Sequence, residues 1–218
     1  MGWNSVDIYE NGDPADLVLG QPDFTSHAPN AGAAISATAF NAPSGLAVDR
    51  ADNLYVADSA NHRILIFLDP AGIDATADRV LGQGGAFTTG VVNSRGLNAA
   101  SLNYPYGLAV DGAENLFVAD TDNNRVLRFD TPLTSDLVAD GVYGQNGSFT
   151  TNQPSTARTT AQPQSGPSQG NLNQPVAVGL DANGDLFVVD TGNNRVLAFR
   201  SVGSPRVNNK RYLPTLIR

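Results

Sequence analysis

The sequence predicts an all-β fold made of repeated four-stranded antiparallel sheets, and three observations support this prediction. A segment of fifteen residues occurs three times with small changes. Apolar residues alternate within each copy, as strands require, and helical periodicity is absent. The 22 glycines and 13 prolines among 218 residues favour many turns between short strands. The copies are NLYVADSANHRILIF at 53–67, NLFVADTDNNRVLRF at 115–129 and DLFVVDTGNNRVLAF at 185–199.

The spacing of the repeated residues defines a structural unit. Asp58, Asp120 and Asp190 are separated by 62 and 70 residues. A second marker, LGQ or YGQ, recurs at intervals of 62 and 62 residues, at 19–21, 81–83 and 143–145. The additional residues of the last interval therefore fall in the Ser, Thr, Gln and Pro-rich stretch, which predicts a long surface loop at 148–170.

Each unit contains predicted strands in a fixed order. In the first unit GLAVD at 45–49 follows a proline and is small and apolar, which suits an inner strand. NLYVAD at 53–58 and RILIF at 63–67 are the second and third strands, and RVLGQ at 79–83 is the outer one. Short polar turns join the first two strands. Four antiparallel strands in each repeated unit predict the blades of a β-propeller.

The unit boundaries divide the chain into segments. The predicted segments are three blades at 39–85, 101–147 and 171–199, the loop at 148–170, strands of an incomplete blade at 1–22 and a basic tail at 200–218. The first segment resembles the third and outer strands of a blade without inner strands. The last blade instead lacks a predicted outer strand, because no LGQ marker follows it.

The repeated pattern also resembles a known family. Asn-x-Pro-x-Gly-(Leu/Val)-Ala-Val-Asp, followed by Leu-(Tyr/Phe)-Val-Ala-Asp-(Ser/Thr)-x-Asn-x-Arg-(Ile/Val)-Leu-x-Phe, is similar to the NHL repeat over residues 41–67, 103–129 and 173–199. The third copy departs from the pattern. Ala177 stands where the first two copies have Gly45 and Gly107, and Gly179 stands where they have Ala47 and Ala109. The resemblance implies propeller blades, commonly six in a ring, and the polar insertions look like those of bacterial extracellular members.

Composition argues against several classes of function. With 13 basic and 21 acidic residues the net charge is -8, the wrong sign for nucleic-acid binding. The chain contains no cysteine, so no disulfide or thiolate metal site is expected. His27 and His62 are too few for a histidine-rich zinc centre, and neither a metal nor another cofactor is expected. DANGD at 181–185 is interpreted as a hairpin turn, because the distal glutamate of a calcium loop is missing.

An aspartate and an arginine flank the turn between the second and third strands of every unit. Placed in this way, the two side chains can bond each other or the amides of the turn. A catalytic centre is needed only once, so we interpret these recurring pairs as structural and expect no catalytic residue. The pairs are Asp58 with Arg63, Asp120 with Arg125, and Asp190 with Arg195.

A candidate ligand-binding rim lies where the copies differ. We expect the turns between the second and third strands to share one face with the connections that enter the inner strands. Variation on a constant frame is typical of a binding surface, although drift in unconstrained loops produces the same pattern. The candidate rim residues are His62, Tyr104, Tyr106, Asp122, Asn124, Gln174 and Asn194.

These observations favour a non-enzymatic interaction or assembly scaffold that associates with itself. Propellers typically close with about four to eight blades, so three blades leave sheet edges open. Strand exchange, in which residues 17–21 of one chain complete the last blade of another, would join two chains into a six-bladed ring or many into a filament. A chain that is part of a longer propeller would explain the same defects.

Two other hypotheses remain open. One is a sensor that binds a carbohydrate or a peptide at the surface of a bacterium, which fits an extracellular location, although no signal peptide precedes the first repeat. The other is a lyase or lactonase of the kind that propellers host. No segment is long and apolar enough for insertion into a membrane.

Overall fold

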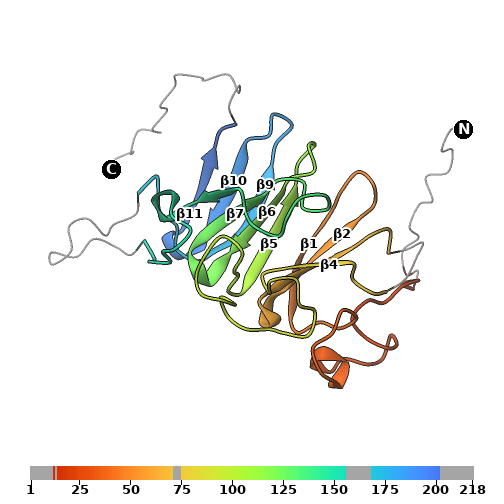
Figure 1. Cartoon of the computed structure of the whole chain (residues 1–218). Coiled ribbons are helices and arrows are strands. Elements are labelled where there is room, and N and C mark those ends of the chain that lie inside the picture. The colour runs from red at the N-terminus through yellow and green to blue at the C-terminus, as the bar shows by residue number, and fades with distance from the viewer. Residues whose placement is uncertain (1–11, 13, 71–74, 156–167, 202–218) are drawn as a thin grey trace, which may run out of the picture.

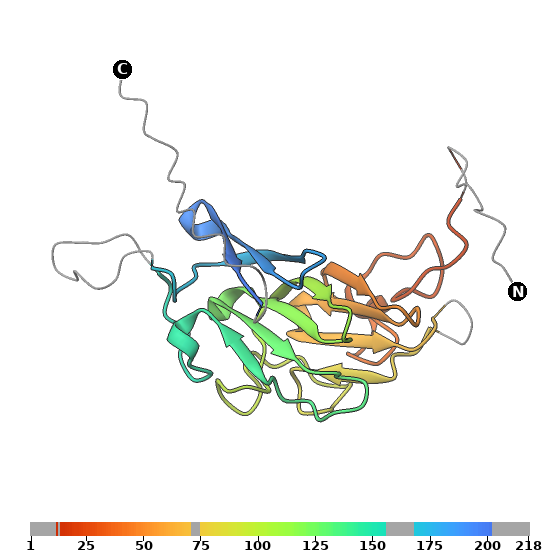
Figure 2. The same cartoon turned by 90° about the horizontal axis from the view of Figure 1, so that it is seen from above.

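The computed structural model describes residues 12, 14–70, 75–155 and 168–201. Within these ranges the chain forms eleven β-strands and five short 3-10 turns, with no α-helix. The strands form three antiparallel sheets that stand side by side in chain order, orange, green and blue in Figures 1 and 2. The predicted all-β fold with propeller blades is confirmed.

Each sheet corresponds to one predicted blade. Blade 1 consists of β1 (Pro43–Val48), β2 (Leu54–Asp58), β3 (Arg63–Phe67) and β4 (Arg79–Leu81). Blade 2 consists of β5 (Pro105–Val110), β6 (Leu116–Asp120), β7 (Arg125–Phe129) and β8 (Gly141–Tyr143). Blade 3 consists of β9 (Pro175–Leu180), β10 (Leu186–Asp190) and β11 (Arg195–Phe199). Within the described part of the chain, blade 3 therefore lacks the fourth strand of the other two.

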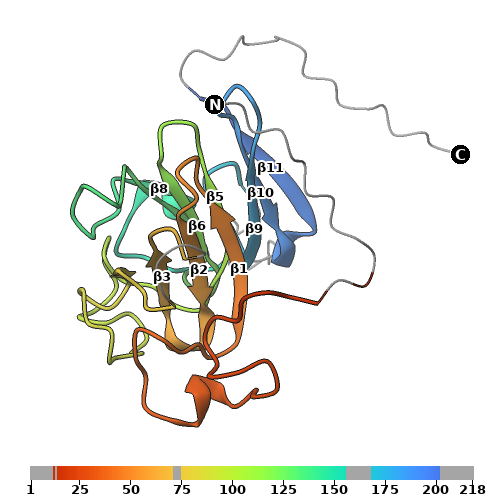
Figure 3. The same cartoon turned by 90° about the vertical axis from the view of Figure 1, so that its right-hand side faces the viewer.

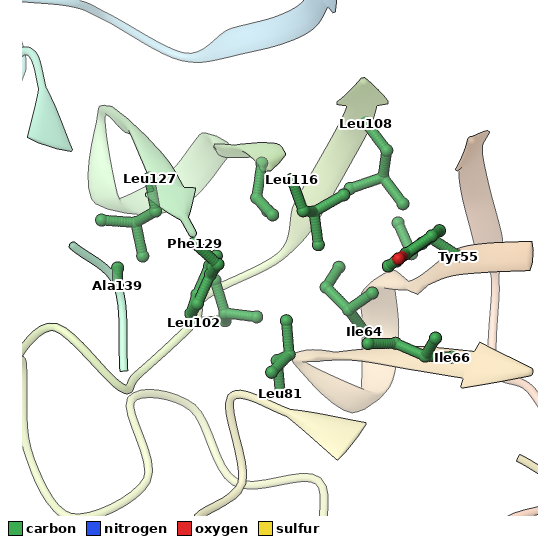
Figure 4. Packing of buried hydrophobic residues seen from close by; sticks show 12 residues of the cluster. Tyr55, Ile64, Ile66, Leu81, Leu102, Leu108, Leu116, Leu127, Phe129 and Ala139 are labelled. Carbon is green, nitrogen blue, oxygen red and sulfur yellow. The ribbon is translucent and has the colours of Figure 1, made fainter. Parts of the chain in front are cut away.

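The blades pack face to face, because alternating residues give each strand two apolar sides. Between blades 1 and 2, Tyr55 and Ile64 pack with Leu116 and Phe129, as Figure 4 shows. Between blades 2 and 3 a second cluster is formed by Phe117, Val126, Leu172, Leu186 and Val188. Continuous burial of this kind provides most of the stabilisation expected of a repeat protein.

The inner strands approach so closely that one position of β5 requires glycine. A Cβ added to Gly107 would lie 2.7 Å from the Cα of Ala177 and 2.8 Å from the carbonyl oxygen of Val176. Gly45 is in the same situation against the carbonyl oxygen of Tyr106. Backbone contact of this kind leaves no room for a side chain.

The segment before β1 covers part of the free side of blade 1 (Figure 3). Leu19 packs against a cluster that includes Phe40, Val56 and Phe67. Residue 12 and residues 14–22 form no strand in this structure, although the sequence predicts strands of an incomplete blade here. The proposed role of this segment as a strand donor therefore stays a prediction.

An ion pair closes the turn between the second and third strands of each blade, and it is completely buried in blades 1 and 2. The Arg63 Nε donates to Asp58 Oδ2 at 2.6 Å, and both side chains are completely buried. The corresponding distances are 2.7 Å for Arg125 with Asp120 and 2.6 Å for Arg195 with Asp190. The strand register places each aspartate directly opposite its arginine.

Each pair also bonds the backbone of the loops around its blade. In blade 2 the Arg125 guanidinium donates to the carbonyl oxygens of Asn98, Ser101 and Phe149, at 3.0, 2.9 and 2.6 Å. Asp120 Oδ1 accepts from the N–H of Asn103 at 2.7 Å. The same set of bonds surrounds Arg63, so the pairs hold the connections onto the sheets.

The long connection between blades 2 and 3 is fixed at its ends. The carbonyl oxygen of Gln153 accepts from Gln145 Nε2 at 2.9 Å, and the N–H of Ser155 donates to Leu172 at 3.1 Å. On the far side, the carbonyl oxygen of Ser168 accepts from Arg195 at 2.9 Å. Residues 156–167 of the predicted loop lie outside the described residues.

Replacing Asp120 by Ala should lower the free energy of unfolding by about 3 kcal/mol, because Arg125 would remain as an unpaired buried charge. Urea denaturation measures the loss. The control is Asp122→Ala, an exposed aspartate of the same turn, whose effect should stay within about 0.5 kcal/mol. An Asp120→Ala variant as stable as the native chain would contradict a structural role. Loss of an enzymatic turnover in such a variant would indicate a catalytic role instead.

Replacing residues 156–167 by a short Gly/Ser bridge should change the free energy of unfolding by less than about 1 kcal/mol, because loop closure depends weakly on length. Extending the replacement to 153–169 should cost more, since it removes the bonds of Gln153, Ser155 and Ser168. Chemical denaturation of the two variants compares them. Equal losses would show that the flanking bonds contribute nothing.

Candidate functional site

The predicted rim residues gather at the end of the sheets that carries the turns η2 (Ser59–Asn61), η3 (Thr121–Asn123) and η5 (Thr191–Asn193). We call this end the turn face. The residue after each turn has a left-handed backbone, with φ of 52° at His62, 54° at Asn124 and 51° at Asn194. Asparagine and histidine adopt this conformation more readily than most residues.

Two of these residues bond the next blade. His62 Nδ1 accepts from the N–H of Tyr104 at 3.0 Å. Asn124 Oδ1 accepts from the N–H of Gln174 at 2.9 Å. Tyr104 and Gln174 occupy the same repeat position, immediately before the proline that begins an inner strand. His62 and Asn124 therefore join neighbouring blades, a role that the sequence analysis did not anticipate.

A hydroxyl group makes a second bond across each of these two junctions. Ser59 Oγ donates to the carbonyl oxygen of Pro105 at 2.5 Å, and Thr121 Oγ1 donates to that of Pro175 at 2.7 Å. The sequence analysis missed this function, although a hydroxyl residue stands at this position in all three repeats. We call the two-bond junction between consecutive blades a seam.

Aromatic rings cluster on the turn face at the seam between blades 1 and 2. The rings of His62 and Tyr104 meet edge to face, with centroids 5.7 Å apart. Tyr104 stacks on Tyr106 at 6.2 Å with an interplanar angle of 27°. Tyr106 is exposed, so its ring offers a flat apolar surface to a ligand. Asp122, Gln174 and Asn194 are also exposed on this face.

Burial lowers the pKa of His62 below its ordinary value, while the negative charges of Asp122 and Asp58 act weakly in the opposite direction. The neutral ring is also the form that the seam needs, because protonation at Nδ1 would replace the acceptor with a donor. The folded protein therefore favours the uncharged imidazole.

A cleft of about 300 Å³ lies between blades 2 and 3, and sequence analysis did not identify it. Arg128, Tyr143 and Phe199 are among its lining residues. The Arg128 guanidinium is held by Asp130 at 2.6 Å.

No cluster of three or more histidine, cysteine, aspartate or glutamate side chains suited to a metal is found among the residues that the structure describes. No helix in those ranges is long and apolar enough to cross a membrane.

Stability should decrease as the pH falls from about 7 to about 5, because the unfolded chain, with an ordinary histidine pKa near 6.5, binds a proton that the folded chain disfavours at His62. The variant His62→Asn should lose less stability over this range, since it supplies the same acceptor as Asn124 without titrating. Urea denaturation at both pH values measures the difference.

The control is the same substitution at the exposed His27, which takes no part in a seam. Equal losses of stability in the native chain and in His62→Asn would refute the assignment of this seam as acid-sensitive.

Comparison with solved structures finds proteins with similar backbones but few identical residues. A luciferin-regenerating enzyme aligns with a TM-score of 0.43 and 16% identity, over 72% of this chain and 40% of that one. A gluconolactonase from Xanthomonas campestris gives 0.39 and 18%, over 69% and 35%. An auxiliary nutrient binding protein from Bacteroides thetaiotaomicron gives 0.47 and 14%, over 69% and 35%. This chain thus spans less than half the length of each of them. No curated protein sequence gives a significant match.

The family comparison identifies the repeats. The family model for the NHL repeat matches residues 40–67, 102–129 and 172–199. These ranges contain the inner, second and third strands of blades 1, 2 and 3 together with their turns. Three segments of the chain, one in each of its propeller blades, therefore match the NHL repeat.

Proposed function

We propose that this chain is a non-enzymatic assembly scaffold, in which a rigid row of NHL blades associates with other copies of itself. The observation that carries this proposal is the exposure of apolar side chains at both ends of the row. At the blade 1 end Leu46 and Val48 are 67% and 55% exposed. At the blade 3 end Phe187 and Val196 are 41% and 62% exposed. Apolar surface concentrated on a sheet face favours a protein interface.

The recurring polar residues support a scaffold. In blades 1 and 2 the aspartate and arginine of the turn are completely buried and are occupied by each other and by backbone groups. His62 and Asn124 are likewise occupied in seams. These side chains hold the blades in fixed positions, which a platform for binding requires.

The conformation of the LGQ segment at 19–21 supports the exchange of a strand between copies. Gly20 has φ of 83°, as Gly82 and Gly144 do at 96° and 88° in the equivalent segments. Gln21 Nε2 bonds a carbonyl oxygen seven residues later, much as Gln83 bonds that of Val91. Among the described residues β11 lies at the edge of the blade 3 sheet, whereas β3 and β7 have a fourth strand beside them. Residues 17–21 of another copy would supply that strand.

The purified chain should have a mass of at least twice 22.8 kDa in light scattering at micromolar concentration. Deleting residues 1–22 should remove this association if strand exchange holds the copies together. Hydrogen exchange of the β11 amides serves as a second readout, because they gain protection only when an added strand pairs with them. A compact, cooperatively melting monomer of the full chain would refute the proposal.

A ligand-binding function is the second candidate, and the stacked rings of Tyr104 and Tyr106 favour it. Aromatic faces of this kind pack against the flat apolar side of a sugar or a peptide side chain. Binding to a glycan or peptide array that disappears in Tyr106→Ala, with melting unchanged, would support this function.

A further inference from the structure

The two seams within the chain are built alike. In each, a hydroxyl group of one blade donates to a proline carbonyl oxygen of the next, and a side-chain acceptor receives an N–H from the residue before that proline. The bonds of the first seam are Ser59 to Pro105 and Tyr104 to His62. Those of the second are Thr121 to Pro175 and Gln174 to Asn124.

Blade 3 presents the first half of another seam. Thr191 and Asn194 stand at the repeat positions of Thr121 and Asn124. Both are exposed, and their side chains make no hydrogen bond to the described residues. The turn geometry is the same, because Asn194 has a left-handed φ of 51° like its counterparts. Blade 3 therefore carries a hydroxyl and a carboxamide at the positions they occupy in a seam, with no following blade among the described residues.

Blade 1 presents the matching half. Pro43 stands at the position of Pro105 and Pro175, and Ala42 precedes it. Ala42 has φ of 51°, close to the 53° of Tyr104 and the 47° of Gln174, although alanine rarely adopts this conformation. Ala42 and Pro43 are exposed. The carbonyl and N–H groups of a seam are thus preformed at the opposite end of the row.

The apolar residues of the two ends correspond in the same way. Val196 is 62% exposed, whereas Val126 and Ile64, at the same repeat position in blades 2 and 1, are completely buried against the following blade. Leu46 is 67% exposed, whereas its equivalent Leu108 is 8% exposed against the preceding blade. The side chains are alike, so their exposure results from the neighbour that is missing.

We propose that blade 3 of one chain packs face to face against blade 1 of a second copy, forming a third seam with the contacts of the two internal ones. Thr191 then donates to Pro43 of that copy, and Asn194 accepts from its Ala42. Val196 and Leu46 become buried in the same interface. The inference rests on the proposed self-association and specifies the surfaces that carry it. It is compatible with strand exchange, because residues 17–21 of the second copy precede its blade 1 just as 81–83 precede blade 2.

One residue weakens this third seam relative to the internal ones. Ala177 occupies the position of Gly45 and Gly107, where a Cβ meets the backbone of the next blade. Its methyl group prevents the inner strands from approaching as closely as they do within the chain. The contact between copies is therefore looser than the internal seams, and Ala177→Gly should strengthen it.

The experiment uses two face variants of the full chain. Val196→Asp and Leu46→Asp should each raise the dissociation constant of the assembly at least about tenfold, because a carboxylate would be buried without a partner. Val91→Asp, at a 57% exposed valine in the connection between blades 1 and 2, is the matched control and should assemble normally. Ala177→Gly should lower the dissociation constant. Melting temperatures identify any variant that fails to fold.

Mixing the two face variants gives the sharpest result. The Leu46→Asp chain keeps an intact blade 3 face and the Val196→Asp chain an intact blade 1 face, so the mixture should form a dimer of twice 22.8 kDa that neither forms alone. Assembly that is insensitive to both substitutions would overturn the third seam while leaving self-association standing. A native chain that stays monomeric would overturn both proposals. If Val196→Asp also lowered the melting temperature of that monomer, the blade 3 face would be covered by residues of the same chain.

Discussion

Each blade depends on a carboxylate and a guanidinium that meet in the turn between its second and third strands. Burying either charge alone would cost several kcal/mol, so the pair is tolerated only because backbone groups complete its hydrogen bonding. The arginine donates to carbonyl oxygens of the connection that precedes its blade. In blades 1 and 2 it also donates to a carbonyl oxygen of the connection that follows. The aspartate accepts from a backbone N–H just before the inner strand. One ion pair thereby positions connections that have little apolar surface of their own.

The turn that the pair closes also carries the residues that join the blades. The residue after each turn is left-handed in all three repeats, and in blades 1 and 2 its side chain accepts a hydrogen bond from the following blade. A ring nitrogen of His62 and a carboxamide oxygen of Asn124 serve equally as the acceptor there. The rim can thus vary in residue type without loss of the blade arrangement.

The sequence predicted the strands and the ion pairs because both recur at fixed intervals, and Asp58 faces Arg63 as the hairpin requires. It did not predict the bond between His62 and Tyr104, because a single chain does not reveal which turn residue reaches across to another blade. The hydrogen bond from the Thr121 hydroxyl to Pro175 was not predicted for the same reason. Recurrence shows that a residue matters to the unit but does not show whether its partner lies inside the unit or beyond it.

The two internal seams use different chemistry for one bond, and the difference matters in acid. An imidazole that takes up a proton turns from acceptor to donor and then opposes the N–H of Tyr104, whereas the carboxamide of Asn124 is unaffected. Of the two internal seams, the one between blades 1 and 2 is therefore the one that acid weakens. Acid would weaken the contact between blades 1 and 2 more than the contact between blades 2 and 3, while the apolar cluster around Tyr55 and Phe129 still holds the first two blades together.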